Sequence, residues 1–107
     1  MFNETQRVEV ARMLAQKLLM ESKDDKARFI QVFKLLACRA PTTAEYTVCN
    51  KLLTQMRSRY KAAPEDAKEL LSIGDLPRNE KLNAADHAAW TQVCTTLLAS
   101  DIAILLY

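Results

Sequence analysis

The stretch that decides the fold is AAWTQVCTTLLASDIAILLY, residues 88–107, which carries one formal charge, Asp101, in a chain that is 26% charged. Three interpretations are open for it: a membrane anchor, a partner-binding surface, or the middle of a core. A membrane-spanning helix needs about 20 predominantly apolar residues, and three threonines, a glutamine, a serine and the aspartate interrupt this one. Helical spacing places Trp90, Leu97 and Ile104 on one line. The segment therefore predicts the central helix of a bundle and no membrane span.

The composition supports an all-α fold. One of the 107 residues is glycine and three are proline, whereas an all-β domain of this size needs many more turn residues. The length suits a single domain, residues 1–107. The formal net charge of +2 gives no reason to expect nucleic acid or an anionic membrane as a partner.

Local signals divide the chain into helices. Thr42 and Glu45 have the spacing of a capping box, in which each satisfies a free backbone N–H at the start of a helix. Ser22 with Asp25, and Asn83 with Asp86, have the same spacing, and Pro64 suits the first position of a helix. We expect a compact bundle of four longer helices, about 4–20, 23–39, 43–61 and 84–106, and one short helix, about 64–72.

The same pattern predicts how the helices lie. The helices 23–39 and 43–61 are joined by only a few residues, so we expect an antiparallel hairpin. Glu9, Arg12 and Gln16 form the polar edge of the first helix, opposite its apolar stripe. Gly74 fits the stop after the short helix.

No metal site is predicted. The soft ligands are His87, Cys38, Cys49 and Cys94. His87 and Cys94 are seven residues apart on one helix, about 10.5 Å along its axis, which is too far to share one zinc ion. Cys38 and Cys49 flank the connection after residue 39 and are interpreted as small core residues.

His87 follows Asp86 in the first turn of the last helix, and the pair has two interpretations. One is a general base that a carboxylate orients, and the other is a surface histidine beside a capping aspartate. Adjacent helical residues diverge by about 100°, so we expect the second. We predict no catalytic residue and no bound cofactor in this chain.

Four basic residues crowd the second half of the helix 43–61, namely Lys51, Arg57, Arg59 and Lys61. They are either a phosphate-binding strip or a solvated face whose cations suit a helix C-terminus. Acidic residues follow at once, so we expect a solvated face and no nucleic-acid partner. Met13, Met20 and Met56 could line an adaptable groove, but methionines at helical spacing are more often core filler.

The apolar end of the chain is the candidate interaction surface. Residues 102–107, IAILLY, carry no charge, so either the bundle encloses them or they pack on another part of a longer protein. An exposed apolar patch of this kind is typical of a protein-binding surface. The candidate residues are Ile102, Leu105, Leu106 and Tyr107.

Three stretches, NETQRVEVARMLAQKLL, FKLLACRAPTTAE and ELLSIGDLPRNEKLNAADHAAWTQVCTTLLASD, occur here in order. Together they resemble the C-terminal part of a planctomycete-specific domain of unknown function, found in large proteins that often carry cytochrome c-type domains upstream. The matching motifs are a helix start, a loop and a second helix start with a Leu-Leu pair. Their residues are Arg39, Pro41, Thr42 and Glu45; Gly74, Pro77 and Arg78; and Ala88 to Thr91 with Leu97 and Leu98.

The resemblance implies that this chain is the C-terminal fragment of a longer, exported protein, periplasmic or at the cell surface. It implies that any haem lies on upstream domains, and it supplies no catalytic residues. The first function hypothesis is a non-catalytic helical module that packs on upstream domains or on another protein. The second is an enzyme fragment whose active site lies mainly upstream and is completed by His87 and the loop Asp75–Arg78.

Overall fold

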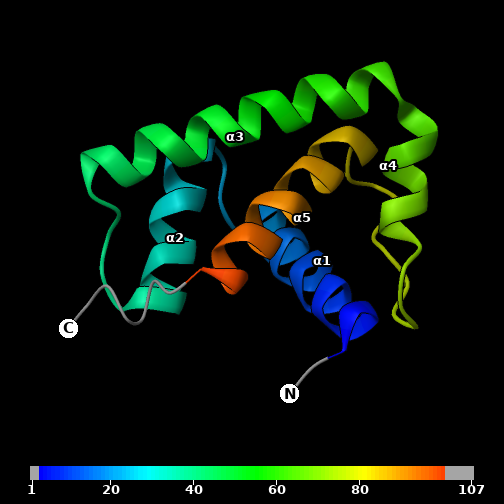
Figure 1. Ribbon diagram of the computed structural model, residues 1–107, viewed down its shortest axis with the longest axis horizontal. Coiled ribbons are helices and arrows are strands. Elements are labelled where there is room, and N and C mark those ends of the chain that lie inside the picture. Colours follow the sequence, from blue (N-terminus) through cyan, green and yellow to red (C-terminus); the bar gives the residue numbers. More distant parts are fainter. Residues whose placement is uncertain (1–2, 101–107) are drawn as a thin grey trace.

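Helix α5 (Ala84–Ala99) is the centre of the fold in this computed structural model, which describes residues 3–100. It packs against α1, α3 and α4 (Figure 1). The architecture is an all-α bundle, as the sequence predicts, and no helix within the described residues is long and apolar enough to cross a membrane. The other helices are α1 (Glu4–Glu21), α2 (Asp25–Ala37), α3 (Thr43–Ala62) and α4 (Pro64–Leu71).

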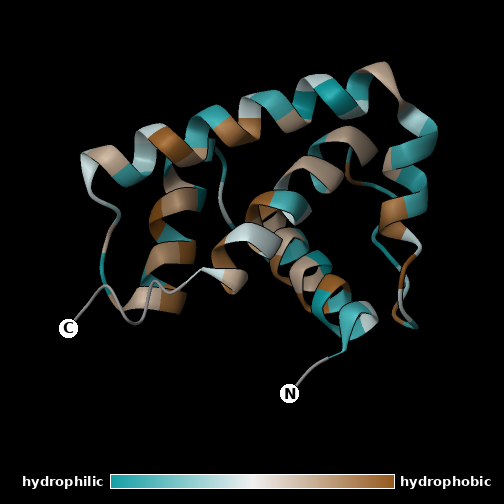
Figure 2. Ribbon diagram, viewed as in Figure 1, coloured by the Kyte–Doolittle hydropathy of each residue, from teal (hydrophilic) through white to brown (hydrophobic). Residues whose placement is uncertain are grey.

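The core is built around Trp90, which is fully buried. The ring of Phe29 from α2 lies 4.7 Å from that of Trp90 and meets Tyr46 of α3 edge-on at 5.5 Å. Aromatic pairs in such tilted and edge-on geometries are favourable beyond the area they bury. Figure 2 shows the matching pattern, with hydrophobic residues along α2, α5 and one edge of α3. One aromatic cluster therefore joins three helices.

The capping box at the start of α3 is confirmed. The backbone N–H of Glu45 donates to Thr42 Oγ1 at 3.1 Å, and the backbone N–H of Thr42 donates to Glu45 Oε1 at 2.8 Å. Arg39 also binds both carboxylate oxygens of Glu45, at 2.7 and 2.9 Å. The hydrogen bond from Arg39, helped by Thr42, lowers the pKa of Glu45 to about 2. Arg39 and Glu45 thus tie the end of α2 to the start of α3.

Two predicted helix boundaries are wrong. The N-cap of α2 is Asp24, not Ser22, because the carboxylate of Asp24 accepts from the N–H of Ala27 at 2.8 Å. Helix α5 ends at Ala99, well before the predicted 106. Ser100 has an extended backbone, and its hydroxyl donates to the carbonyl of Leu97 at 2.8 Å. A side chain that satisfies a terminal carbonyl in this way favours the end of a helix over its continuation.

The antiparallel hairpin is also wrong, because α3 crosses α2 at a steep angle (Figure 1). The connection between them, residues 38–42, includes Cys38 in the left-handed conformation, with φ of 58°. Both helices are oriented by α5: α3 packs along it, and α2 places Phe29 on Trp90. Packing on the central helix therefore decides the crossing, and the short connection does not.

A charged cluster joins the starts of α2 and α5 to the middle of α3. Arg57 binds both carboxylate oxygens of Asp25, at 2.5 and 2.8 Å, and its Nε donates to Asp86 at 3.0 Å. The hydrogen bond from Arg57 lowers the pKa of Asp25. Because both carboxylates lie in the first turn of a helix, they also suit the helix dipoles.

Candidate interaction groove

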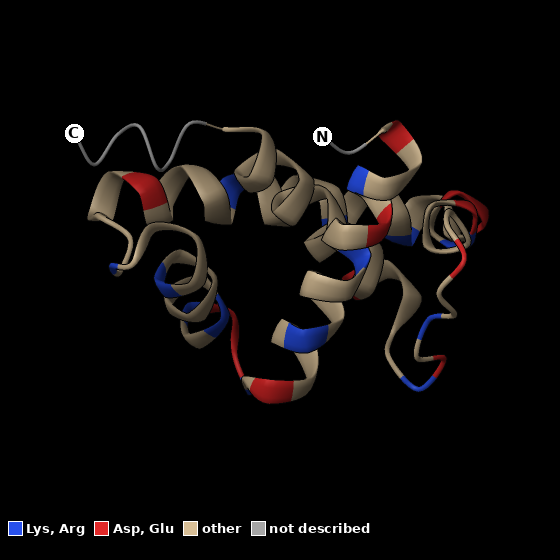
Figure 3. Ribbon diagram, turned by 90° about the horizontal axis from the view of Figure 1, so that it is seen from below, with Lys and Arg blue, Asp and Glu red and all other residues tan. Residues whose placement is uncertain are grey.

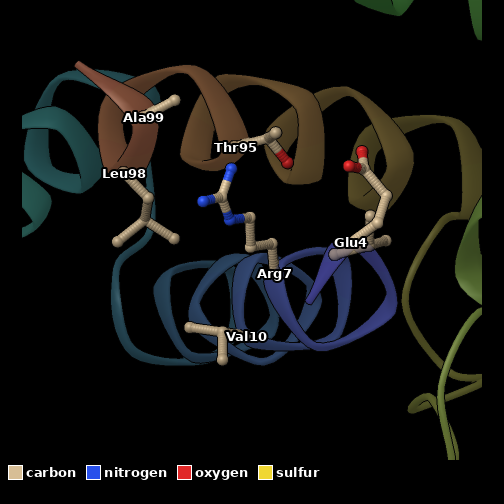
Figure 4. Close-up of a pocket in the computed structure, with 7 residues that line it drawn as sticks. Glu4, Arg7, Val10, Thr95, Leu98 and Ala99 are labelled. Carbon is tan, nitrogen blue, oxygen red and sulfur yellow. The ribbon is translucent and has the colours of Figure 1, made fainter. Parts of the chain in front are cut away.

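A groove of about 520 Å³ lies between the first turns of α1 and the last turns of α5 (Figure 4). We call it the α1–α5 groove. Apolar side chains form most of its walls, with two charged residues at its rim. Its lining residues are Glu4, Arg7, Val8, Val10, Thr95, Leu98 and Ala99.

Small residues on α5 create the hollow. Thr95 and Ala99 are one turn apart and lie on the uncharged edge of α5, so this edge leaves room against α1. Leu98 is 40% exposed, and Val10 across the groove is 37% exposed, because α1 covers α5 incompletely at this end. One partly exposed apolar side chain from each helix therefore lines the groove.

Two charged side chains at the groove, Arg7 and Glu4, form no ion pair within residues 3–100. Figure 4 shows the guanidinium of Arg7 between Thr95 and Leu98, and the carboxylate of Glu4 toward the other end. Elsewhere basic and acidic residues are interspersed in the view of Figure 3. The groove thus offers apolar contact flanked by one cation and one anion.

The described side chains of this lining carry few reactive groups. It contains no cysteine or histidine, and its hydroxyl, on Thr95, donates to the carbonyl of Thr91 at 2.8 Å. A nucleophile needs a base within hydrogen-bond reach, and no such pair lies among the lining residues. The predicted interaction residues Ile102, Leu105, Leu106 and Tyr107 lie outside the described residues.

His87 lies elsewhere, and its expected surface position is wrong. The side chain is fully buried, and its Nε2 lies 3.1 Å from the carbonyl oxygen of Arg12. Asp86 is turned away from it toward Arg57, as the divergence of adjacent helical residues predicts. The burial arises because α1 crosses α5 at this turn, an arrangement that no local pattern in the sequence encodes.

The predicted polar edge of α1 is not solvated either. Arg12 is fully buried, and its guanidinium donates to the carbonyl oxygens of Ile73 and Leu76, the latter at 2.7 Å. Glu9 accepts from the N–H of Leu76 at 2.7 Å, and Gln16 accepts from the N–H of Asn79 at 2.9 Å. A loop has no helical partners for its backbone groups, so α1 supplies them. We call residues 73–79 the latch loop.

Gly74 is required in the latch loop, although it does not cap α4, which ends at Leu71 with Ser72 as its C-cap. Its φ is +97°, and an added Cβ would lie 2.5 Å from Oε2 of Glu9. We expect Gly74→Ala to lower the free energy of unfolding by about 1–2 kcal/mol through backbone strain. Urea unfolding followed by circular dichroism checks this. Asp75→Ala, at an exposed neighbour, is the control, and an equal effect of the two changes would contradict the assignment.

The basic strip is divided in the structure. Arg57 is occupied by Asp25 and Asp86, and the guanidinium of Arg59 lies 5.1 Å from the ring centroid of Tyr60. Lys51, Arg59 and Lys61 are exposed and form no ion pair with any residue between 3 and 100. Of the four cations, Arg57 is therefore the one that the fold itself engages through ion pairs among the described residues.

The cysteines and methionines take different positions. Cys94 is buried, and its burial raises the pKa of its thiol, whereas Cys49 is half-buried with a pKa raised chiefly by burial. Cys38 is exposed, contrary to its expected place in the core, because it occupies the left-handed C-cap of α2.

Met56 packs against the core, but Met20 is exposed and not core filler. Among residues 3–100, no three His, Cys, Asp or Glu side chains gather where they could hold a metal ion.

Comparison of the chain with protein-family models, curated proteins and solved structures finds no match.

Proposed function

We propose that this chain is a non-catalytic helical interaction module that binds an amphipathic helix, from another protein or another part of a longer polypeptide, in the α1–α5 groove. The observation that carries this proposal is the open apolar pair, Val10 and Leu98, above the small residues Thr95 and Ala99. Two antiparallel or crossing helices with a hollow between them can accept a third helix, whose apolar side chains at i, i+3/i+4 and i+7 fill the groove.

The charges at the rim indicate what the partner carries beside its apolar face. Arg7 lies over the groove and lacks a carboxylate partner among residues 3–100. A carboxylate of the bound helix beside Arg7 would complete this pair, and complementary charges of this kind set orientation and partner choice more than affinity. The proposed partner is therefore a helix with a leucine-rich face flanked by an acidic residue.

The resemblance to the planctomycete domain supports the proposal that the module belongs to a larger protein. In that context it is the C-terminal part of a larger exported protein, with any haem on upstream domains, and the helix it binds belongs to those domains or to a separate protein. This context is part of the proposal and rests on the motif residues of the sequence.

A peptide titration tests the proposed site. The probe is a synthetic 16-residue amphipathic helix with leucines on one face and glutamates along its flank, added to the isotopically labelled chain. We expect amide shift changes around Val10 and Leu98, and at least about a tenfold weaker binding for Leu98→Glu, because burial of one large apolar side chain contributes about 1.5–3 kcal/mol.

Matched controls come from exposed apolar residues outside the groove. Leu35 on α2 is 51% exposed and Val48 on α3 is 69% exposed, so Leu35→Glu and Val48→Glu should leave peptide binding unchanged. In a charge-reversal experiment, Arg7→Glu should weaken binding of the glutamate-flanked peptide and strengthen binding of a lysine-flanked peptide. If the shifts map away from the groove, or if the control changes weaken binding as much as Leu98→Glu, the proposed site is wrong.

A further inference from the structure

Away from the groove, the imidazole ring of His87 and the latch loop both contact Arg12 of α1. The latch loop is held to α1 by Glu9, Arg12 and Gln16, through its backbone groups at Ile73, Leu76 and Asn79. Its own side chains contribute little to the core, since Asp75, Leu76 and Pro77 are exposed. The attachment of this loop therefore depends on a few polar contacts, and such segments open at low cost relative to core helices.

His87 lies behind the same attachment. Its ring contacts the backbone carbonyl of Arg12, the residue whose guanidinium holds the loop. Because a carbonyl oxygen can only accept, Nε2 must donate, and a neutral ring then leaves Nδ1 without its proton. Nδ1 is buried and has no hydrogen-bond partner among the described residues. The fold thus accommodates neutral His87 and offers nothing to accept a second ring proton.

The charges around the ring also oppose protonation. Burial lowers the pKa of His87 below its ordinary value, and the positive charges of Arg12 and Arg78 lower it further, against the opposing effect of the hydrogen bond to Arg12. On α1 the nearby carboxylate is Glu9, which is engaged by the N–H of Leu76. A protonated ring would therefore be a third cation beside the guanidinium groups of buried Arg12 and half-buried Arg78.

The other helices packed on α5 do not supply a compensating charge. The α3 cation Arg57 is neutralised by Asp25 and Asp86, so neither carboxylate is available to His87. Helix α4 turns Ala67 and Leu71 inward, and its charged residues are exposed. Within α5 the buried thiol of Cys94 has a raised pKa, so it is neutral over the same pH range.

We propose that His87 and the latch loop form an acid-sensitive switch, in which protonation of His87 favours release of the loop from α1. Arg12 links the ring to the loop, because its backbone carbonyl contacts buried His87 and its guanidinium holds the carbonyl of Leu76. When the loop is released from α1 (the open state), the hydrated His87 ring binds a proton near its ordinary pKa of about 6.5. When the loop is attached (the closed state), the ring does not bind a proton at that pH.

The direction of the effect follows from this difference. The folded pKa is lowered, so the closed loop is fully stabilised above about pH 6.5 and loses stability as the pH falls below that value. Each pH unit below about 6.5 should raise the open population about tenfold until the closed state also binds the proton. The switch therefore works well above the range in which carboxylates titrate.

Hydrogen exchange at two amides tests the switch, because the N–H groups of Leu76 and Asn79 make the latch contacts. After correction for the intrinsic rate, we expect their protection to fall about tenfold from pH 7.5 to pH 5.5, while α5 amides around Trp90 keep theirs. His87→Gln, which can still donate to Arg12 but takes up no proton, should abolish this pH dependence. Glu9→Gln should lower protection at both pH values and keep the dependence.

Three results would overturn the proposal. They are equal loop protection at both pH values in the wild-type chain, an unchanged pH dependence in His87→Gln, or a loss of protection at acid pH that is uniform over all helices. If His87→Gln does not fold, the pH titration of the His87 ring in the wild-type chain replaces that test, because His87 is the one histidine in the sequence. Its imidazole resonance should then titrate below the ordinary value, and an ordinary midpoint would contradict the switch.

Discussion

Replacing Trp90 with alanine is expected to lower the free energy of unfolding by about 3–5 kcal/mol, the range for truncating a large buried aromatic residue. Trp90 is fully buried on the central helix and packs on Phe29. A domain of this size has a total stability of about 5–15 kcal/mol, so one substitution removes a large part of it. Urea unfolding followed by far-ultraviolet circular dichroism measures the loss, because the change also removes the chain's one tryptophan.

Trp90→Phe is the matched control for packing. The indole Nε1 of Trp90 is buried without a hydrogen-bond partner among the described residues, and an unsatisfied buried donor costs about 1–3 kcal/mol. Phenylalanine removes that donor and keeps most of the apolar volume, so we expect less than half the effect of alanine. A larger loss for phenylalanine than for alanine would show that Trp90 is not held by packing.

Arg12→Met should have the second largest effect, a loss of about 2–4 kcal/mol. The substitution keeps most of the buried length of the side chain but leaves the carbonyls of Ile73 and Leu76 without their donors, at about 1–3 kcal/mol for each carbonyl that stays buried. The latch loop should also lose its hydrogen-exchange protection. Urea unfolding and exchange at Leu76 and Asn79 measure the two effects separately.

The control for this prediction lies on the same helix. Lys17 is exposed and pairs only with Glu21 in the next turn, so Lys17→Met should change the unfolding free energy by no more than about 0.5 kcal/mol. If Arg12→Met behaves like Lys17→Met, then water satisfies the loop carbonyls once the guanidinium is gone. Arg12 would in that case be a space-filling residue and not the anchor of the loop.

Local sequence signals predicted the helices because these signals act within one turn. The Thr42–Glu45 box, Asn83 at the start of α5 and Pro64 at the start of α4 are all found where their spacing placed them. Each depends on backbone N–H groups a few residues away. At the start of α2 the predicted cap was Ser22, whereas Asp24 caps the helix, because both residue types accept a backbone N–H readily and the spacing alone did not decide between them.

The candidate site could not be predicted in the same way. The signal that could have indicated the α1–α5 groove was the small, uncharged edge with Thr95 and Ala99, but its meaning depends on which helix lies opposite. Leu98 lies beside buried Leu97 in the sequence, and the gap between α1 and α5 leaves it exposed. A hollow is a property of two surfaces together, so one surface alone does not define it.

The sequence by itself determined that this chain is all-α, where most of its helices begin, and that Trp90 lies at the centre of the core. Those features follow from apolar periodicity and from caps, which are local. Only the tertiary structure decided that Arg12 and His87 are buried, that Arg57 joins three helices, and that α3 crosses α2. Polar residues of these kinds are usually exposed, and they are buried here because segments distant in the sequence provide the carbonyls and carboxylates that they bind.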